Sequence, residues 1–242
     1  MRAPTEEAMN KTIGILGGMG PLATADLYRK IVLLTDAAGD NDHIRTFIDS
    51  NCRIPDRTAA ILNGGKDPVE EMSSALRNLE KCGASCIIMP CNTAHYFLPR
   101  LQAQTETPIL SMLEATAAEC ARKYPGKTAA VLATRGTLAT GLYDRALEAA
   151  GVPFLIPGED EKAALMYLIY EVVKASKPIM PEAERWEALL QTLRAQGADY
   201  FILGCTELPI LADTLPAPGP FIDPTAELAK AAIRFCGCSV KE

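Results

Sequence analysis

Two cysteines of this chain stand directly after strongly apolar runs. Cys91 follows the run in IIMPCNTAH, and Cys205 follows the run in YFILGCTEL. The thiolate is the reactive form of cysteine, and a helix N-terminus lowers the pKa of a thiol. Each cysteine precedes polar residues and a helix-like pattern, so we expect both turns to favour the thiolate. Such a side chain can act as a general acid or a general base.

Other roles for a strand-end cysteine have to be weighed against this one. A single cysteine of this kind is more often a small buried hydrophobic residue than a catalyst. A zinc site is disfavoured because the chain has no CxxC pair and its two histidines are His43 and His95. His95 follows Cys91 by four residues, and we interpret it first as a structural residue and second as an acid or base. The case for chemistry therefore depends on the presence of two cysteines at matched positions.

The segments that contain the two cysteines resemble each other. LRNLEKCGASCIIMPC (residues 76–91) aligns without gaps on LQTLRAQGADYFILGC (residues 190–205), an offset of 114 residues (205 − 91). GPLATADLYRKIV from Gly20 likewise resembles GTLATGLYDRALE from Gly136, and TPIL resembles GPFI, in the same order and at similar offsets. Three matches at a nearly constant offset indicate an internal duplication, with each copy close to half the chain.

Strand-like apolar runs alternate with helical patterns through both copies. KTIGILGG, SCIIMPC, TAAVLAT and DYFILGC are typical of buried strands, and segments of helical spacing separate them. Strands separated by helices predict an α/β fold with two similar domains, each a parallel sheet flanked by helices. We place the N-terminal domain at residues 10–109 plus 225–242 and the C-terminal domain at residues 110–224. The duplication predicts a pseudo-two-fold relation between the domains and an active site in the interdomain cleft.

The predicted fold gives the two cysteines a common geometry. Ligands of parallel sheets bind outside the carboxyl ends of the strands, which is where Cys91 and Cys205 fall. If the domains face each other, the two sulfur atoms approach a ligand from opposite sides. A thiolate on one side can remove a proton from carbon while a thiol on the other side returns one, and the centre is inverted. These residues therefore predict two-base racemisation, in which the two groups exchange roles with direction.

Composition argues against several other classes of protein. The formal net charge of -6 disfavours a nucleic-acid binder, because phosphate recognition needs a basic face. The segment MRAPTEEAMNKT is not typical of a secretory signal, and no apolar run has the length of a membrane span. We expect a soluble cytoplasmic protein without nucleic-acid or membrane partners, in which the eight cysteines are reduced.

Two other functions stay open at this point. Gly18, Gly20 and Ala23 in GILGGMGPLAT satisfy the GxGxxG/A pattern of dinucleotide-binding loops. Pro21 interrupts the pattern, however, and a glycine-rich turn that lines the cleft with backbone N–H groups accounts for it as well. A non-catalytic nucleotide or small-anion binding protein is therefore one alternative. A thiol redox sensor that joins the two strand-end cysteines is another.

Six motifs occur in order over nearly the whole chain: GGMGPLAT, IPDRT, MPCNTAH, LATRGT, GCTEL and IDP. Together they resemble the cofactor-independent aspartate/glutamate racemase family, and within it most closely the aspartate racemases. The resemblance implies two α/β domains with the active site between them and two cysteines as acid and base. It also implies that no pyridoxal phosphate, other cofactor or metal takes part, and that the protein is a homodimer.

The resemblance also implies roles for individual residues around the cysteines. Cys91 and Cys205 match the proton-transfer pair of the family. Asn92 and Thr93 after the first cysteine, and Thr206 after the second, match residues that bind the α-carboxylate and amino group of the substrate.

Further positions match residues of the substrate site. Arg57 in IPDRT and Lys174 in IYEVVKAS resemble the pair that binds the distal carboxylate in aspartate racemases. An arginine fork suits a carboxylate and lysine supplies a point charge, although the usual fate of either is a solvated surface position. Lys177 is close enough in sequence to be confused with Lys174, and Ser176 replaces an expected glycine, which affects the aim of that lysine. Thr134 in LATRGT is expected to line the cleft.

We therefore expect an enzyme that interconverts L- and D-aspartate, an amino-acid racemase that needs no cofactor. Glutamate or another amino acid is the nearest alternative substrate, because one methylene is worth only about 1–3 kcal/mol of discrimination in a pocket. Some relatives replace one cysteine with threonine and act mainly on one enantiomer. Both cysteines are present here, which favours catalysis in both directions.

Overall fold

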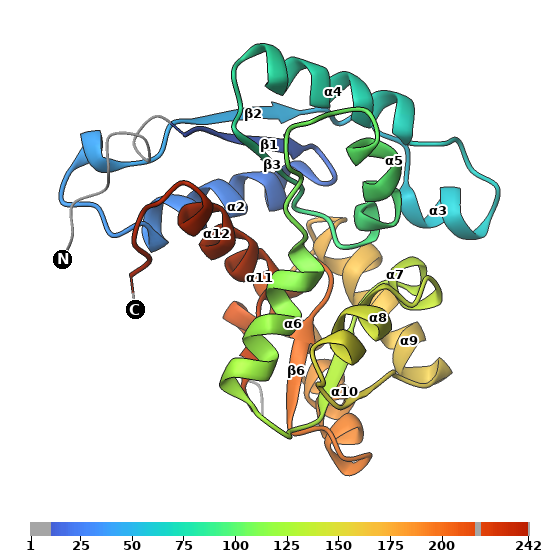
Figure 1. Cartoon of the computed structure of the whole chain (residues 1–242). Coiled ribbons are helices and arrows are strands. Elements are labelled where there is room, and N and C mark those ends of the chain that lie inside the picture. The colour runs from blue at the N-terminus through green and yellow to red at the C-terminus, as the bar shows by residue number, and fades with distance from the viewer. Residues whose placement is uncertain (1–10, 216–218, 242) are drawn as a thin grey trace. The chain divides into compact units, whose positions relative to one another are not determined.

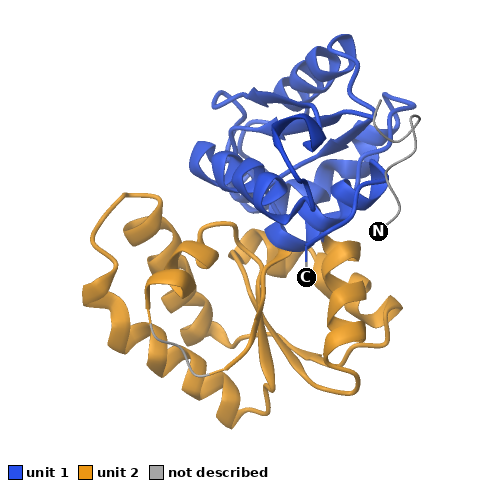
Figure 2. Cartoon of the chain, turned by 90° about the vertical axis from the view of Figure 1, so that its left-hand side faces the viewer, with its two compact units in different colours: residues 1–112, 225–242 blue, residues 113–224 orange. Residues whose placement is uncertain are grey.

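The chain divides into two compact units. In a computed structural model, which describes residues 11–215 and 219–241, one unit comprises Met1–Met112 with Thr225–Glu242 and the other comprises Leu113–Pro224 (Figure 2). Each unit contains a parallel sheet flanked by helices (Figure 1). The predicted fold class, an α/β protein with two parallel sheets, is confirmed.

The sheet of the first unit has the strand order β2-β1-β3. Strand β1 (Ile13–Gly17) pairs in parallel with β2 (Thr46–Ser50) on one side and with β3 (Cys86–Ile88) on the other. A parallel bridge between Ile87 and Ile109 extends the sheet beyond β3. Every residue of β1 and β3 is buried, as expected for parallel strands that are covered on both faces.

Helices cover both faces of this first sheet. Side chains alternate across a strand, so Ile15 packs with α2 (Pro21–Leu34) and α12 (Pro224–Phe235), whereas Leu16 packs with α4 (Val69–Lys81). The C-terminal helix α12 thus completes the core of the first unit. The shorter segments of this unit are η1 (Asp40–Asp42), α3 (Arg57–Leu62), η2 (Thr93–Phe97) and α5 (Leu98–Gln102).

The second unit repeats this arrangement of strands. Its sheet has the order β5-β4-β6-β7. Strand β4 (Ala129–Leu132) pairs in parallel with β5 (Phe154–Leu155) and with β6 (Tyr200–Leu203), and β6 pairs in parallel with β7 (Phe221–Ile222). The two central strands β4 and β6 are buried along their whole length.

Equivalent hydrogen bonds support the duplication inferred from the sequence. In the first unit, the Ile87 N–H donates to the Pro108 carbonyl at 2.9 Å; in the second, the Phe201 N–H donates to the Pro220 carbonyl at 3.1 Å. The bridged segment around Ile109 therefore has the place in the first sheet that β7 has in the second. The TPIL run contributes this single bridge rather than a full strand.

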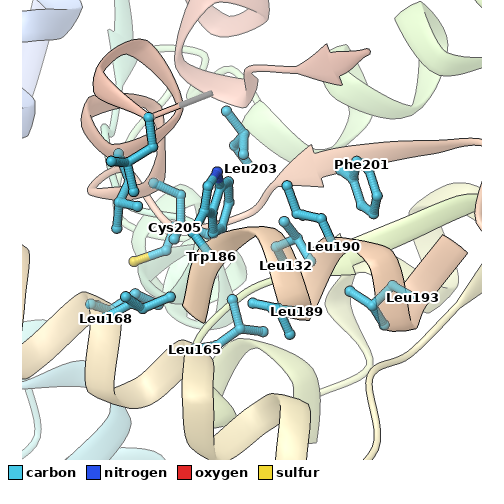
Figure 3. Packing of buried hydrophobic residues seen from close by; sticks show 14 of the residues in the cluster. Leu132, Leu165, Leu168, Trp186, Leu189, Leu190, Leu193, Phe201, Leu203 and Cys205 are labelled. Carbon is cyan, nitrogen blue, oxygen red and sulfur yellow. The ribbon is translucent and has the colours of Figure 1, made fainter. Parts of the chain in front are cut away.

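Helices also cover both faces of the second sheet. On one face, Leu132 and Leu203 pack around Trp186 of α10 (Ala183–Ala195), as Figure 3 shows. On the other face, Val131 belongs to a cluster with residues of α6 (Met112–Lys123) and α8 (Leu142–Ala149). The remaining helical segments are α7 (Arg135–Ala139), α9 (Glu159–Met166), η3 (Tyr167–Val173), η4 (Met180–Glu182) and α11 (Leu208–Thr214).

Candidate active site

Three loops leave the first sheet at the same edge. Strands β1, β2 and β3 run in parallel, so the segments that follow them emerge at their shared carboxyl end. These segments are the glycine-rich loop at Gly18, the loop that leads to Arg57, and the turn that carries Cys91, Asn92 and Thr93. The structure also places α3, which begins at Arg57, in contact with η2. Four predicted site residues therefore gather at one edge of the first unit.

Cys91 lies in a buried turn, and His95 forms hydrogen bonds with the backbone of this turn. Only 7% of Cys91 is exposed. His95 Nε2 accepts the Met112 N–H at 3.0 Å, and His95 Nδ1 lies 2.9 Å from the Cys91 carbonyl oxygen. Since Nε2 accepts, Nδ1 carries the proton and donates to that carbonyl. Burial lowers the pKa of His95 to about 4, so the ring is neutral near pH 7. This geometry favours the structural interpretation of His95.

The helical segment after Cys91 is short. Thr93–Phe97 forms a 3₁₀ segment of five residues, and a five-residue α-helix follows it. The 3₁₀ geometry closes hydrogen bonds three residues apart, and the His95 N–H donates to the Asn92 carbonyl at 3.1 Å. Asn92 and Thr93 are both buried beside Cys91. The two polar residues that directly follow Cys91 are thus buried in the same turn as the cysteine.

Arg57 is buried, unlike a solvated surface cation. Its exposed fraction is 9%. The guanidinium donates to the carbonyl of Pro55 at 2.9 Å and to the carbonyl of Met19 at 3.3 Å. Asp56 caps α3 by accepting a backbone N–H at 2.7 Å, which fixes the start of the helix. Arg57 is thereby tied to the glycine-rich loop at the carboxyl edge of the sheet.

The glycine-rich loop uses its glycines for close backbone approach. Gly18 has φ +87°, and a Cβ there would collide with the backbone of Asn51. The Gly18 N–H donates to Thr24 Oγ1 at 2.9 Å, and Pro21 at the start of α2 has no N–H to offer. Two donors that a phosphate loop would use are thus engaged or missing, which weakens the nucleotide-binding alternative.

Thr134 and Cys205 follow neighbouring strands of the second sheet. Leu132 at the end of β4 pairs with Leu203 at the end of β6, so both segments leave the sheet at its carboxyl edge. Thr134 caps α7, and its Oγ1 accepts the Thr137 N–H at 3.3 Å. Thr134 is buried. Thr134 and the Cys205 turn therefore lie at the same edge of the second sheet.

Cys205 is a buried thiol that contacts a carboxylate. It lies among apolar side chains near Trp186 (Figure 3), and its Sγ donates to Glu207 Oε2 at 2.9 Å. Burial raises the pKa of the Cys205 thiol well above its usual value; the negative charge of Glu207 raises it further, and the positive charge of Lys174 opposes the shift. The expectation that this turn favours the thiolate is therefore wrong, because desolvation and the carboxylate outweigh any effect of the short helix α11.

Lys174 is the lysine that reaches the Cys205 turn. Its Nζ lies 2.6 Å from Glu207 Oε1, and 27% of its side chain is exposed. Lys177 instead pairs with Glu171 at 3.7 Å, and both of these side chains are exposed. Lys174 follows η3, a π-helical segment, and its N–H donates to the Ile169 carbonyl. Such wide turns are frequent at functional sites.

Ser176 takes the backbone conformation that glycine prefers. Its φ is +54°, and this left-handed geometry costs an L-residue about 1–2 kcal/mol. The Ser176 N–H donates to the Val173 carbonyl at 3.0 Å, and the Lys177 N–H donates to the Val172 carbonyl at 2.9 Å. The segment therefore ends with the backbone that a glycine would give. The serine does not prevent Lys174 from reaching Glu207.

Glu207 is a site residue that the sequence analysis did not select. Only 7% of it is exposed, and its carboxylate contacts the Cys205 thiol, the Lys174 ammonium and the Thr206 hydroxyl, the last at 3.3 Å. The signal was present in GCTEL, because the residue two positions after the cysteine is an acid in this copy and Thr93 in the other. Its burial was not visible in that pattern.

The described residues contain neither a cluster of metal ligands nor a membrane-spanning helix. Within residues 11–215 and 219–241, no group of three or more His, Cys, Asp and Glu side chains is arranged to hold a metal ion. In the same ranges, no helix has the length and apolar character needed to cross a membrane.

Comparison with known proteins gives the family. Residues 16–232 match the family described as Asp/Glu/Hydantoin racemase. The broad specificity amino-acid racemase RacX of Bacillus subtilis (strain 168) is 30% identical over 225 residues, which cover 91% of this chain and 96% of that protein. A glutamate racemase of Desulforudis audaxviator (strain MP104C) is 31% identical over 193 residues, which cover 72% of this chain and 66% of that protein. The structure of the Picrophilus torridus aspartate racemase aligns with a TM-score of 0.82 and 31% identity over 96% of both chains.

The chain belongs to the Asp/Glu/hydantoin racemase family, and it is a racemase. This result confirms the resemblance drawn from the six motifs. The similar proteins are named for aspartate, for glutamate and for a broad range of amino acids. Family membership therefore gives the type of reaction, and the substrate has to be argued from the site.

Proposed function

We propose that this protein interconverts L- and D-aspartate without a cofactor and that Cys91 and Cys205 are its two proton-transfer groups. The observation that carries the proposal is the matched placement of the cysteines. Each is buried, with 7% exposed, in the turn after an equivalent strand of a duplicated sheet. We further propose that the two turns face each other across the substrate and that the protein is a cytoplasmic homodimer, as the family resemblance implies.

The proposed reaction moves one proton off the α-carbon and another onto it. The thiolate of one cysteine takes the α-proton, and the electron pair of the broken C–H bond stays with the substrate. The thiol of the other cysteine then gives its proton to the opposite face. Asn92, Thr93 and Thr206 hold the α-carboxylate and amino group. Burial raises the pKa of Cys205, so Cys205 is the donating thiol for the enantiomer whose α-proton faces Cys91, and the two cysteines exchange roles for the other enantiomer.

Two cations support an acidic substrate. Arg57 is held in the first unit by backbone carbonyls, and Lys174 is directed to the Cys205 turn in the second unit. A substrate with a second carboxylate can use both charges through charge-assisted hydrogen bonds, which are stronger than neutral ones. The similarity to the P. torridus aspartate racemase over 96% of both chains also supports aspartate. Glutamate or broad specificity is the alternative, since relatives with those names are similar as well.

A substrate panel tests the choice of aspartate. Purified reduced protein is incubated with L-aspartate, L-glutamate or L-alanine without added cofactor, and chiral chromatography follows the D-enantiomers. We expect the highest kcat/KM for aspartate. Lys174→Met should lower it about 10–100-fold more for aspartate than for alanine, because a charged hydrogen bond contributes about 1.5–3 kcal/mol. Lys177→Met is the matched control. Equal rates on aspartate and alanine would support broad specificity instead.

A further inference from the structure

In the second unit, Cys205, Glu207 and Lys174 form a line of polar contacts. The Cys205 thiol donates to one oxygen of Glu207 at 2.9 Å, and the other oxygen of Glu207 lies 2.6 Å from Lys174 Nζ. The side chain of Glu207 is only 10% exposed, so water weakens these interactions less than at a surface. The Glu207 carboxylate therefore contacts both the Cys205 sulfur and the Lys174 ammonium.

A carboxylate in this position restricts what Cys205 can do. An ionised carboxylate has no proton to donate, so the group between it and the sulfur must be the thiol hydrogen. Loss of that hydrogen would place a thiolate against a carboxylate in a poorly hydrated site, and like charges at this distance disfavour each other. The contact is thus compatible with the thiol and unfavourable for the thiolate.

We propose that Glu207 holds Cys205 as the protonated member of the cysteine pair in the resting enzyme, with Lys174 balancing the charge of the carboxylate. This inference rests on the proposed function, in which the pair needs one thiol and one thiolate at the start of each turnover. Glu207 is here a positioning residue, because it acts through Cys205 and not on the substrate. It assigns Cys205 as the proton donor, and Cys91 as the acceptor, for the enantiomer whose α-proton faces Cys91; the other enantiomer requires the reverse arrangement of protons.

Two uncharged hydroxyl groups also lie near Cys205. Tyr143 lies close to this turn, and burial raises the pKa of its hydroxyl well above its usual value, so it stays neutral. The Thr206 hydroxyl contacts Glu207 and carries no charge. Lys174 also faces the ring of Tyr170, with 5.5 Å between Nζ and the ring centre. The largest charge effects on the thiol come from Glu207, which raises its pKa, and from Lys174, which lowers it.

The test is the pH dependence of alkylation at Cys205. Iodoacetamide reacts with the thiolate, and mass spectrometry of the Cys205 peptide gives the rate at each pH without any substrate. We expect the midpoint to move to lower pH in Glu207→Gln, which keeps the shape and loses the charge. It should stay near the wild-type value in Glu207→Asp and move to higher pH in Lys174→Met. Lys177→Met is the control for loss of a nearby surface charge and should match the wild type.

The outcomes separate this inference from the proposed function. An unchanged midpoint in Glu207→Gln would overturn the inference, as would a lower midpoint in Lys174→Met. If Glu207→Gln does not fold, the Lys174→Met result decides alone, because the pair predicts opposite shifts. Alkylation needs no turnover. The expected shifts, to lower pH in Glu207→Gln and to higher pH in Lys174→Met, can therefore be observed even in a protein that fails to racemise aspartate. Racemisation of aspartate by a protein whose alkylation midpoints do not show these shifts would overturn the role of Glu207 and leave the two-cysteine reaction intact.

Discussion

The two cysteine turns lie at equivalent positions of the repeat, but different side chains surround them. Beside Cys91, His95 is neutral and hydrogen bonds only to the backbone in the contacts described above. Beside Cys205, Glu207 and Lys174 form a charged pair, and the thiol itself donates to the carboxylate. The duplicated sheet therefore determines where each sulfur lies. Among the described residues, the side chains that differ between the copies give Cys205, and not Cys91, a carboxylate as a direct partner of the thiol.

This difference suits a reaction that needs two unlike groups. Two-base racemisation begins with one thiol and one thiolate, although both groups are cysteines. Identical surroundings would make the two proton arrangements equally stable, whereas Glu207 favours one of them. The asymmetry between the copies thus has a chemical use under the proposed function.

The neutral support of Cys91 can be tested through the pH dependence of stability. Folded His95 stays neutral down to its pKa of about 4, whereas an unfolded histidine takes up a proton below about pH 6.5. In that window the unfolded chain binds more protons, so lowering the pH lowers the free energy of unfolding. The stability present above about pH 6.5 should fall by up to about 3 kcal/mol as the pH approaches 4.

Denaturant unfolding of the wild type and His95→Gln between about pH 4.5 and 7.5 measures this effect. Glutamine can still donate to one backbone group and accept from another, but it does not titrate. The wild type should lose stability with acid more steeply than the variant, and His43 contributes equally to both. If the free energies of unfolding of the wild type and the variant depend on pH in the same way, His95 is not held neutral. The contrast between a neutral partner at Cys91 and a charged pair at Cys205 would then be wrong.

A smaller effect concerns the segment that directs Lys174 toward the Cys205 turn. Ser176 has φ +54°, which glycine adopts without the penalty of a Cβ. Ser176→Gly should be more stable than Ser176→Ala by about 1 kcal/mol, or about 2–4 °C in Tm for a chain of this size. Alanine is the matched control because it removes the hydroxyl and keeps the Cβ. Equal thermal midpoints for the two variants would contradict the strained backbone at this position.

The sequence predicts the fold well because its signals are local or repeated. Apolar runs such as SCIIMPC and DYFILGC predicted buried strands, and the repeat predicted two similar parallel sheets, as the structure has them. The positions of Cys91 and Cys205 followed from these strands. The TPIL run illustrates the limit of such patterns, since it forms only the bridge at Ile109.

The electrostatic surroundings of the site depend on packing between distant segments. The pKa of Cys205 is set first by burial, which requires Trp186 and Leu168 from other helices to pack around the turn. The contact between Lys174 and Glu207 likewise joins segments that are far apart in sequence. A helix-end rule applied to the residues after Cys205 therefore gave the wrong direction for its pKa. Family resemblance found Lys174, but only the structure showed which group it contacts.

The exchange of the α-proton in D2O tests the two-cysteine reaction most directly. L- and D-aspartate are each incubated with the wild type, Cys91→Ser and Cys205→Ser, without cofactor, while proton NMR follows the α-proton and a chiral assay follows inversion. The wild type should exchange the proton and form the other enantiomer. Each variant should lose about 10²–10⁴-fold in racemisation, the contribution typical of a general acid or base, and retain exchange only for the enantiomer that faces its remaining cysteine. Undiminished racemisation in both variants would contradict the account.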